Sequence, residues 1–260
     1  MKETALITGA SGGIGLELAR LMAADGISLV LVARNESKLA AIKKELEDKG
    51  GEVLLMPGDL TNEGFRTGLY HRLVERGISV DYLVNNAGMG DFGEYIHTKW
   101  EKGQELLNLN IMSLAHLTHL ILGPMIKRKK GRILNIASIA AFQPGPYMSL
   151  YYASKAFVLS FSEALHKETQ GTGVTVTALC PGPTNTGFVE VANLEESMLF
   201  KSLKVAGAKE VAEYGYKVMK KGKAVAVHGF SNKVLVFSVR LAPRRLVRYI
   251  ASKIQGKKGS

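Results

Sequence analysis

Three side chains in this sequence could meet at one point and take part in acid–base chemistry. Ser138 ends the apolar run RILNIAS (132–138), and Tyr151 opens the helical segment YYASKAFVLSFSEALHKE. Lys155 follows Tyr151 by four residues, so the two side chains share one helix face. Together they would place a hydroxyl, a phenol and an ammonium around one point, groups that can exchange protons with a bound molecule.

The spacing of Tyr151 and Lys155 is not unique, so context has to select it. The same Tyr–Lys spacing recurs at residues 95–99, 216–220 and 249–253. These pairs are expected in a loop, a surface helix and a basic tail beyond the last strand, and none has a serine at a strand end. Tyr152 has Ala156 four residues on, so we expect it to point elsewhere. Tyr151 is therefore the tyrosine that we select as the candidate active-site residue.

Strand-like and helical runs alternate along the chain. Apolar runs typical of buried strands lie at 5–8, 28–34, 52–60, 81–88, 132–138, 174–182 and 223–229. Amphipathic helical runs separate them, such as the one at 36–50, which ends at a glycine. This alternation predicts an α/β fold, a doubly wound parallel sheet of about seven strands with helices on both faces. Without a Pro/Ser linker or a repeat, we expect one domain over residues 1–230 and a basic extension over 231–260.

A glycine-rich segment, TGASGGIG (8–15), separates the first strand from the first helix. Its G-x-x-x-G-x-G spacing permits a tight turn and close approach of a pyrophosphate, which the helix N-terminus stabilises. A glycine-rich turn without a ligand is the alternative. Because open α/β sheets bind ligands beyond the carboxyl ends of their strands, this loop and Ser138 should lie at one edge.

The end of the second strand indicates which dinucleotide would bind. An acid there is typical of NAD binding, but this chain has Ala33 and Arg34, with Lys38 one turn later. An arginine suits a 2′-phosphate, so the sequence favours NADP(H); a solvated arginine is the alternative. Asp59, at the end of the third strand, could accept from the adenine amino group or cap the turn before Thr61.

Together these motifs resemble the short-chain dehydrogenase/reductase family, in its short-form branch with a Ser-Tyr-Lys-Asn active site. The matching segments follow the family's order: TGASGGIG (8–15), Asp59–Leu60, NNAG (85–88), Asn110, Ser138, YYASK (151–155) and PGPTNT (181–186). The resemblance implies a Rossmann fold, with Tyr151 as general acid/base and Ser138 orienting the carbonyl. Lys155 would lower the pKa of Tyr151 and hold the nicotinamide ribose. Asn110 would support a water-linked proton relay; bonding to backbone inside a helix is its alternative.

The resemblance also implies a set of residues that hold NADP(H). They are Gly9, Ser11, Gly13, Ile14, Gly15, Arg34, Lys38, Asp59, Leu60, Asn86, Ala87, Gly88, Tyr151, Lys155, Pro181, Gly182, Thr184 and Thr186. Thr184 and Thr186, with the preceding Pro-Gly, resemble the segment that holds the nicotinamide carboxamide.

The expected activity is hydride transfer between NADP(H) and an apolar ketone or aldehyde, or the matching secondary alcohol. No Arg or Lys lies within 138–151 to pair a substrate anion, and a fatty-acyl or steroid-like carbonyl fits. Apolar side chains that could line the substrate pocket are Phe92, Phe142, Tyr147, Met148, Phe188 and Met198. An NADP(H)-binding regulatory module and a membrane-surface scaffold without turnover are the alternatives.

The positive charge is concentrated at the C-terminal end. The net charge is +11, yet residues 214–260 hold twelve Lys or Arg and no acid, while the first 213 residues sum to −1. Pro243 fits the first turn of a helix, in which Leu246, Ile250 and Ile254 form an apolar stripe between cations. This helix could dock on its own domain or a partner subunit, or residues 232–255 could lie on an anionic membrane. Nucleic acid is not expected, because there is one basic stripe and no recognition fold.

The cysteine and histidine content limits which cellular compartment and which metal sites are expected. A lone Cys180 excludes a disulfide framework, fits a reducing cytoplasmic compartment, and is expected to be a buried packing residue. The six His lack metal-ligand spacing, so we expect no metal, with His116 and His119 as structural or surface residues. Neither a signal-peptide pattern nor an uninterrupted apolar run of ~18 residues is present. The expected location is cytoplasmic or peripheral on a membrane, and the family suggests a homo-oligomer, a dimer or tetramer.

Overall fold

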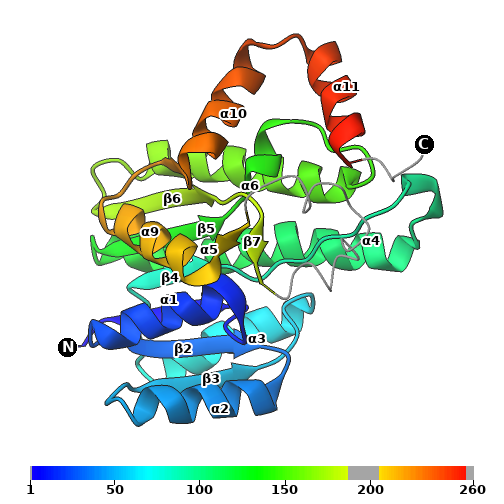
Figure 1. Cartoon of the computed structure of the whole chain (residues 1–260). Coiled ribbons are helices and arrows are strands. Elements are labelled where there is room, and N and C mark those ends of the chain that lie inside the picture. Colours follow the sequence, from blue (N-terminus) through cyan, green and yellow to red (C-terminus); the bar gives the residue numbers. More distant parts are fainter. Residues whose placement is uncertain (1, 187–204, 256–260) are drawn as a thin grey trace.

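A computed structural model describes residues 2–186 and 205–255 of the chain (Figure 1). Within these ranges the central element is one parallel sheet of seven strands in the order β3-β2-β1-β4-β5-β6-β9. The strands are β1 (Thr4–Thr8), β2 (Ser28–Ala33), β3 (Val53–Pro57), β4 (Tyr82–Asn85), β5 (Gly131–Ile136), β6 (Val174–Cys180) and β9 (Val225–Val227). The order reverses between β1 and β4, so the sheet is doubly wound as predicted. Two short strands, β7 (Thr184–Asn185) and β8 (Ala206–Gly207), pair separately.

Helices cover both faces of the sheet (Figure 1). They are α1 (Gly13–Ala24), α2 (Glu36–Glu47), α3 (Glu63–Glu75), α4 (Trp100–Leu107), α5 (Leu114–Lys127), α6 (Ser149–Glu168), α9 (Ala208–Lys220), α10 (Phe230–Leu241) and α11 (Arg244–Gln255). Shorter helical turns are η1 (Tyr95–His97), η2 (Asn108–Ser113) and η3 (Ile139–Phe142).

The two faces of the sheet build two hydrophobic cores, because successive side chains of a strand point to opposite sides. In β1, Ala5 and Ile7 pack with α1, α2 and α9, whereas Leu6 packs with α3 and α5. All three β1 side chains are fully buried. Burial of a side chain such as leucine or isoleucine contributes roughly 1.5–3 kcal/mol, so these cores fix the sheet that positions the loops.

Several predicted strands are shorter in the structure than their apolar runs. The runs 52–60 and 81–88 end as strands at Pro57 and Asn85, and the residues that follow form loops at the carboxyl edge. These loops turn because polar groups bond locally; the Asp59 carboxylate, for example, accepts a hydrogen bond from the Thr61 backbone amide. The third strand and fourth strand are confirmed, but their last residues belong to the candidate site.

The placement of Tyr216 on a surface helix is wrong. Tyr216 is 7% exposed, because α9 packs along α1 at the edge of the core. Its hydroxyl donates a hydrogen bond to Asp25, 2.7 Å away. This tyrosine ties α9 to the C-terminal end of α1.

Helices α10 and α11 form a hairpin that stands beyond β6 and α6, at one lateral side of the sheet, coloured orange and red in Figure 1. The hairpin is docked on the chain's own body through Val247, Ala251 and Gln255, which are buried. The predicted stripe of Leu246, Ile250 and Ile254 lies beside this face and is 48%, 46% and 39% exposed. Both sides of α11 are thus apolar, and only one is covered.

Among the described residues, the helical run Trp100–Lys127 is long and apolar enough to cross a membrane by length and composition alone. Its Leu117, Ile121 and Met125 are buried with the sheet in the second core. That is the environment of a core helix.

Candidate active site

The glycine-rich loop between β1 and α1 requires glycine at specific positions. Gly9 has a φ of +63°, in the left-handed region that glycine adopts without strain. An added Cβ on Gly15 would lie 2.4 Å from the Asn86 side-chain nitrogen and 2.5 Å from the Gly9 carbonyl oxygen. The first turn of α1 therefore sits against the loop after β4, and the helix N-terminus faces the carboxyl edge, a cradle that suits a pyrophosphate.

Thr8 and Asn86 clamp the two loops to each other. The Asn86 side-chain amide donates to the Thr8 and Gly9 carbonyl oxygens, both at 3.0 Å. In return, the Thr8 hydroxyl accepts from the backbone amides of Asn86 and Ala87, both at 3.0 Å. Thr8 was not among the predicted site residues, because a threonine ending a buried strand carries no signal distinct from β-propensity. The role of Thr8 is seen only in the structure, where its hydroxyl holds the loop after β4.

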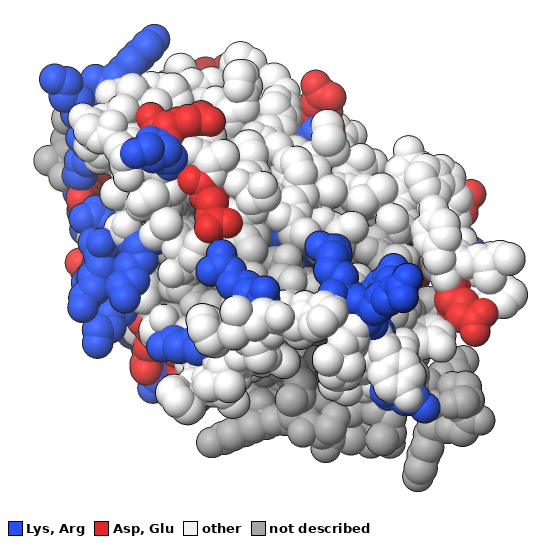
Figure 2. Space-filling view, turned by 90° about the horizontal axis from the view of Figure 1, so that it is seen from above, with Lys and Arg blue, Asp and Glu red and all other residues white. Residues whose placement is uncertain are grey.

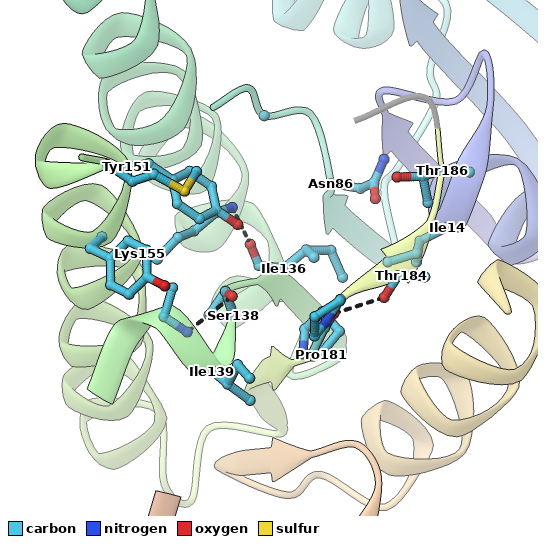
Figure 3. A pocket seen from close by; sticks show the side chains of 18 of the residues that line it. Ile14, Asn86, Ile136, Ser138, Ile139, Tyr151, Lys155, Pro181, Thr184 and Thr186 are labelled. Atoms are coloured by element: carbon cyan, nitrogen blue, oxygen red, sulfur yellow. Dashed lines mark hydrogen bonds between the residues drawn. The ribbon is translucent and has the colours of Figure 1, made fainter. Parts of the chain in front are cut away.

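Ser138, Tyr151 and Lys155 are brought together on one wall of a pocket, opposite Ile14, Asn86 and Thr184 (Figure 3). Ser138 lies two residues beyond β5, where its hydroxyl caps η3 by accepting from the Ala140 amide at 3.1 Å. Tyr151 lies in the first turn of α6, which begins two residues earlier than predicted, at Ser149. Lys155 is buried, and its ammonium donates to the Ile136 carbonyl oxygen at 2.8 Å.

The electrostatics of this wall differ from the expected lowering of the tyrosine pKa by lysine. Burial raises the pKa of Tyr151 to about 12, and a hydrogen bond with Ser138 opposes it only in part. The Lys155 nitrogen lies 5.8 Å from the centre of the Tyr151 ring, and burial lowers the lysine pKa to about 8. Desolvation penalises both charged forms. At neutral pH the wall therefore presents a neutral phenol and an ammonium.

Asn110 lies in the π-helical turn η2, beside the loop after β4. Its side-chain oxygen accepts from the Met89 amide at 2.9 Å, and its nitrogen donates to the Met89 carbonyl at 2.9 Å and to Ser154 at 3.0 Å. Asn110 is buried and does not line the pocket. This geometry matches the alternative of an asparagine that bonds backbone. It also fixes the loop close to Lys155, since a Cβ on Gly88 would lie 3.2 Å from Asn110 and 3.5 Å from the lysine nitrogen.

The opposite end of the pocket presents cations where a nucleotide's adenosine half would lie. Arg34 and Lys38 both line it. The Arg34 side chain is 65% exposed and donates to Glu105 of α4 at 3.0 Å. Asp59 caps its own turn, as the second of its two interpretations has it.

The segment after β6 closes the pocket on a third side. Pro181, Gly182, Thr184 and Thr186 line it, and the Thr184 hydroxyl donates to the Gly182 carbonyl at 2.9 Å. Thr186 packs against the glycine-rich loop, where a Cβ on Gly13 would meet its methyl carbon at 2.8 Å. Cys180 just before them is fully buried, as expected of a packing residue, and burial raises the pKa of its thiol to about 12.

The pocket is one continuous cavity of about 780 Å³. Every predicted cofactor residue lines it except Gly15, whose part is the close packing described above. Of the predicted substrate residues, Met148 lines it. Phe92, Phe142 and Tyr147 do not, because they pack into neighbouring clusters. Phe188 and Met198 lie outside the described residues.

Sequence reasoning missed one whole wall of this pocket. The hairpin contributes Leu235, Ser238, Val239, Ala242, Val247, Ile250, Ala251, Ile254 and Gln255. Tyr152, which was expected to point elsewhere, also lines the pocket, and its hydroxyl accepts a hydrogen bond from the Gln255 side chain. The only signal in the sequence was the apolar repeat of the tail. Such a repeat predicts that one helix face is covered, but not that this face lines a pocket.

His116 accepts a hydrogen bond from Arg66 at 3.0 Å, which places it in a structural contact between α5 and α3. Across residues 2–186 and 205–255, no three His, Cys, Asp or Glu side chains gather where they could hold a metal ion.

Comparison with known proteins matches this chain to one family model and to proteins of related architecture. The model for short chain dehydrogenases matches residues 3–197. Ketoacyl reductase HetN from Nostoc sp. is 34% identical over 69% of this chain and 63% of its own length. The 17-beta-hydroxysteroid dehydrogenase type 3 of Mus musculus is 37% identical over 74% of this chain and 64% of its own length. The chain thus aligns with a little under two thirds of these two relatives.

Solved structures agree in fold over nearly the whole chain. A short-chain dehydrogenase from Sphingobium yanoikuyae in complex with NADPH superposes with a TM-score of 0.82 at 29% identity, covering 99% of this chain and 98% of that one. One from Burkholderia phymatum in complex with NAD gives 0.83 at 25% identity, covering 100% and 97%. Both nicotinamide dinucleotides therefore occur among similar structures.

Proposed function

The chain belongs to the short-chain dehydrogenase family, and from this premise we propose that it transfers hydride between NADP(H) and an apolar ketone or aldehyde, or the matching secondary alcohol. One observation carries the proposal. Ser138, Tyr151 and Lys155 lie on the wall of the same cavity as the glycine-rich loop. A carbonyl bound at this wall would lie within the cavity that also admits the dinucleotide.

The residues of the chain divide the chemistry between them. When bound, NADPH supplies the hydride. The glycine-rich loop and the α1 N-terminus would hold its pyrophosphate. The Ser138 hydroxyl orients the carbonyl oxygen, and the Tyr151 phenol gives that oxygen a proton as negative charge develops on it. Because burial keeps Tyr151 protonated at neutral pH, its proton is transferred only to a stronger base, such as the nascent alkoxide.

Lys155 and Asn110 support this wall. The Lys155 ammonium, held by the Ile136 carbonyl, would bond the nicotinamide ribose. Asn110 positions the loop that carries Gly88 against that lysine. In this role Asn110 would act indirectly, by holding the backbone at Met89 in place.

Arg34 and Lys38 support a preference for NADP(H) over NAD(H). Both line the pocket beyond the end of β2, where an acid would otherwise bond the ribose 2′-hydroxyl. The partner of Arg34 is the exposed Glu105 carboxylate. Exchange of a surface ion pair for a 2′-phosphate contact costs little, because exposed pairs contribute about 0–1 kcal/mol.

An apolar substrate fits the composition of the remaining wall. The hairpin contributes mainly aliphatic side chains to the pocket, among them Val239, Val247 and Ile250. The similar proteins named above are a ketoacyl reductase and a hydroxysteroid dehydrogenase. We extend this to a fatty-acyl or steroid-like carbonyl as the substrate class.

For its partners and location, we propose a cytoplasmic homo-oligomer, a dimer or tetramer, that meets an anionic membrane surface through residues 232–255. Domain boundaries at residues 1–230 and 231–260 belong to the same proposal. Binding of nucleic acid is not proposed.

The function is tested by following oxidation of NADPH and of NADH with a panel of apolar ketones and aldehydes. Wild type should oxidise NADPH, and Tyr151→Phe should lower the rate by about 10²–10⁴-fold, the contribution of a positioned general acid. Tyr152→Phe is the matched control, because it changes the neighbouring ring without removing the proposed donor. NADPH binding without oxidation by wild type would instead favour a regulatory binding module.

A further inference from the structure

We propose that the outer face of the α10–α11 hairpin docks on an anionic lipid bilayer, and that the mouth of the substrate pocket opens within this docked face. Apolar substrate would then pass from the bilayer into the pocket without crossing water. The part that concerns substrate rests on the proposed function, whereas the docking does not.

The hairpin carries a large apolar surface that nothing in the described chain covers. Its exposed apolar side chains are Phe230 (82%), Val234 (52%), Phe237 (64%), Leu241 (72%), Leu246 (48%), Tyr249 (61%), Ile250 (46%) and Ile254 (39%). On α10, Phe230, Val234, Phe237 and Leu241 follow one another at helical spacing and therefore share one face. Contiguous apolar patches of this kind mark interaction sites.

Charge identifies the occupant of this face. Residues 230–255 carry six cations and no acid: Lys233, Arg240, Arg244, Arg245, Arg248 and Lys253. Figure 2, which views the molecule from above, shows Lys and Arg side chains spread over a largely uncharged surface, together with some Asp and Glu side chains. An anionic bilayer satisfies both features, because acyl chains accept the aromatic and aliphatic side chains while headgroups pair with the cations.

Other occupants fit less well. A second copy of the same face would bring like charges together around the apolar patch, which is unfavourable. A nucleic acid would pair with the cations but leave Phe230, Phe237 and Leu241 in water. The membrane is thus the one partner that covers the whole face.

The pocket opens at the same place. Ile250 and Ile254 line the pocket and are also 46% and 39% exposed, which fits a position at its rim. Val247 and Ala251, one helix position away, line the pocket and are buried. One helix therefore separates the pocket interior from the docking face, and a side chain at the rim touches both.

The hairpin is also attached in a way that links docking to the substrate site. Gln255, at the end of α11, is buried and donates to the hydroxyl of Tyr152, the residue after the proposed proton donor. Val247, Ala251 and Gln255 are the buried residues of the hairpin. Helix α10 also contacts η3, and its Leu235 and Val239 line the pocket, so both helices of the hairpin adjoin the proposed substrate site.

The first experiment measures cosedimentation of the full chain with vesicles of neutral lipid alone and with added anionic lipid. Wild type should bind anionic vesicles at least about tenfold more tightly than neutral ones, given about 1 kcal/mol per cation near the surface. Phe230→Ser/Phe237→Ser should lose this binding. The matched control is Val74→Ser, which removes a 56% exposed apolar side chain from α3, a helix that lies well away from the hairpin in Figure 1.

A second variant separates charge from apolar contact. Arg244→Gln/Arg245→Gln/Arg248→Gln should remove the preference for anionic lipid. Lys127→Gln/Lys217→Gln/Lys221→Gln, which removes three exposed cations elsewhere, should keep it. Equal and negligible binding of wild type to both vesicles would overturn the docking. So would variants that change only the oligomeric state, which would assign the face to a second copy.

The activity measurement compares a short, water-soluble ketone with a long-chain ketone dissolved in anionic vesicles. Phe230→Ser/Phe237→Ser should slow turnover of the vesicle-dissolved ketone by about tenfold or more and leave the short ketone unchanged. If this double variant lost vesicle binding but turned over both ketones at the wild-type rates, the pocket would not open within the docked face. A wild type that turns over neither ketone yet binds vesicles would refute the proposed function and leave the docking standing.

Discussion

The two ends of the pocket are built by opposite means. The nucleotide end is held by backbone geometry, with Gly9, Gly15 and the Asn86 clamp packed at contact distance. The hairpin end is held by a few buried side chains of α11, and most of its surface faces outward. The nucleotide end excludes a Cβ at Gly9 and Gly15, whereas the hairpin end presents many side chains that are exposed. The difference teaches that the two ends of one pocket can differ in how much sequence change they tolerate.

The largest effect is expected from a substitution in the closely packed nucleotide end of the pocket. Gly15→Ala places a methyl group 2.4 Å from the Asn86 side chain and 2.5 Å from the Gly9 carbonyl oxygen, so the loops must separate. We expect a loss of about 1–3 kcal/mol in the free energy of unfolding without ligand, as for overpacking. NADPH affinity should fall by about a hundredfold or more. Denaturant unfolding and calorimetry measure the two losses.

Gly12→Ala is the control for this substitution. A Cβ on Gly12 meets nothing within 4 Å, and the φ of 175° is extended backbone that any residue adopts. Stability should therefore be nearly unchanged. Equal destabilisation by the two alanines would show that the loop is not held by close packing.

Next in size is the choice between the two dinucleotides. Arg34→Ala should raise the KM for NADPH by about 10- to 100-fold, the value of a charge-assisted contact, and leave the KM for NADH unchanged. Glu105→Gln removes the competing carboxylate and should lower the KM for NADPH slightly. If Arg34→Ala weakened both cofactors alike, arginine would not be reading the 2′-phosphate.

The next smaller effect is a pH dependence of the free energy of unfolding, which we expect from the buried Lys155. Burial lowers the pKa of Lys155 to about 8 in the folded chain, against about 10.4 in an unfolded chain. Between these values the unfolded chain binds more protons, so the free energy of unfolding rises with pH. Relative to Lys155→Met, wild type should gain about 1–3 kcal/mol from pH 8 to 10. A difference that stays flat over this range would contradict the lysine's low pKa.

The smallest effect on overall stability is expected at the hairpin. Ala251→Asp buries a carboxylate under α11, where the side chain is 4% exposed, and should release the hairpin. Trypsin should then cleave after Arg244 and Arg245 many times faster, while the melting temperature of the sheet changes by a few degrees. Tyr249→Asp, on the exposed side of the same helix, should change neither. A large drop in melting temperature would show that the hairpin belongs to the core.

The sequence predicted the nucleotide end better than the hairpin end, for a physical reason. Alternating runs and the glycine spacing are local signals, and they placed every strand of the main sheet and the convergence of Ser138 with Tyr151. The direction of the Tyr151 pKa depends on desolvation by residues distant in sequence, so it was missed. Likewise, α11 is apolar over a wide arc, and periodicity alone cannot tell that Val247 and Ala251 are covered while Leu246 is not.

The position of the hairpin after β9 has a consequence for how this protein can diverge. Within the described residues, no strand of the main sheet follows the hairpin. Mutations confined to residues 230–255 could therefore change one wall of the pocket and the proposed docking face together. Substrate preference and membrane association would then evolve together, while the rest of the protein stayed unchanged.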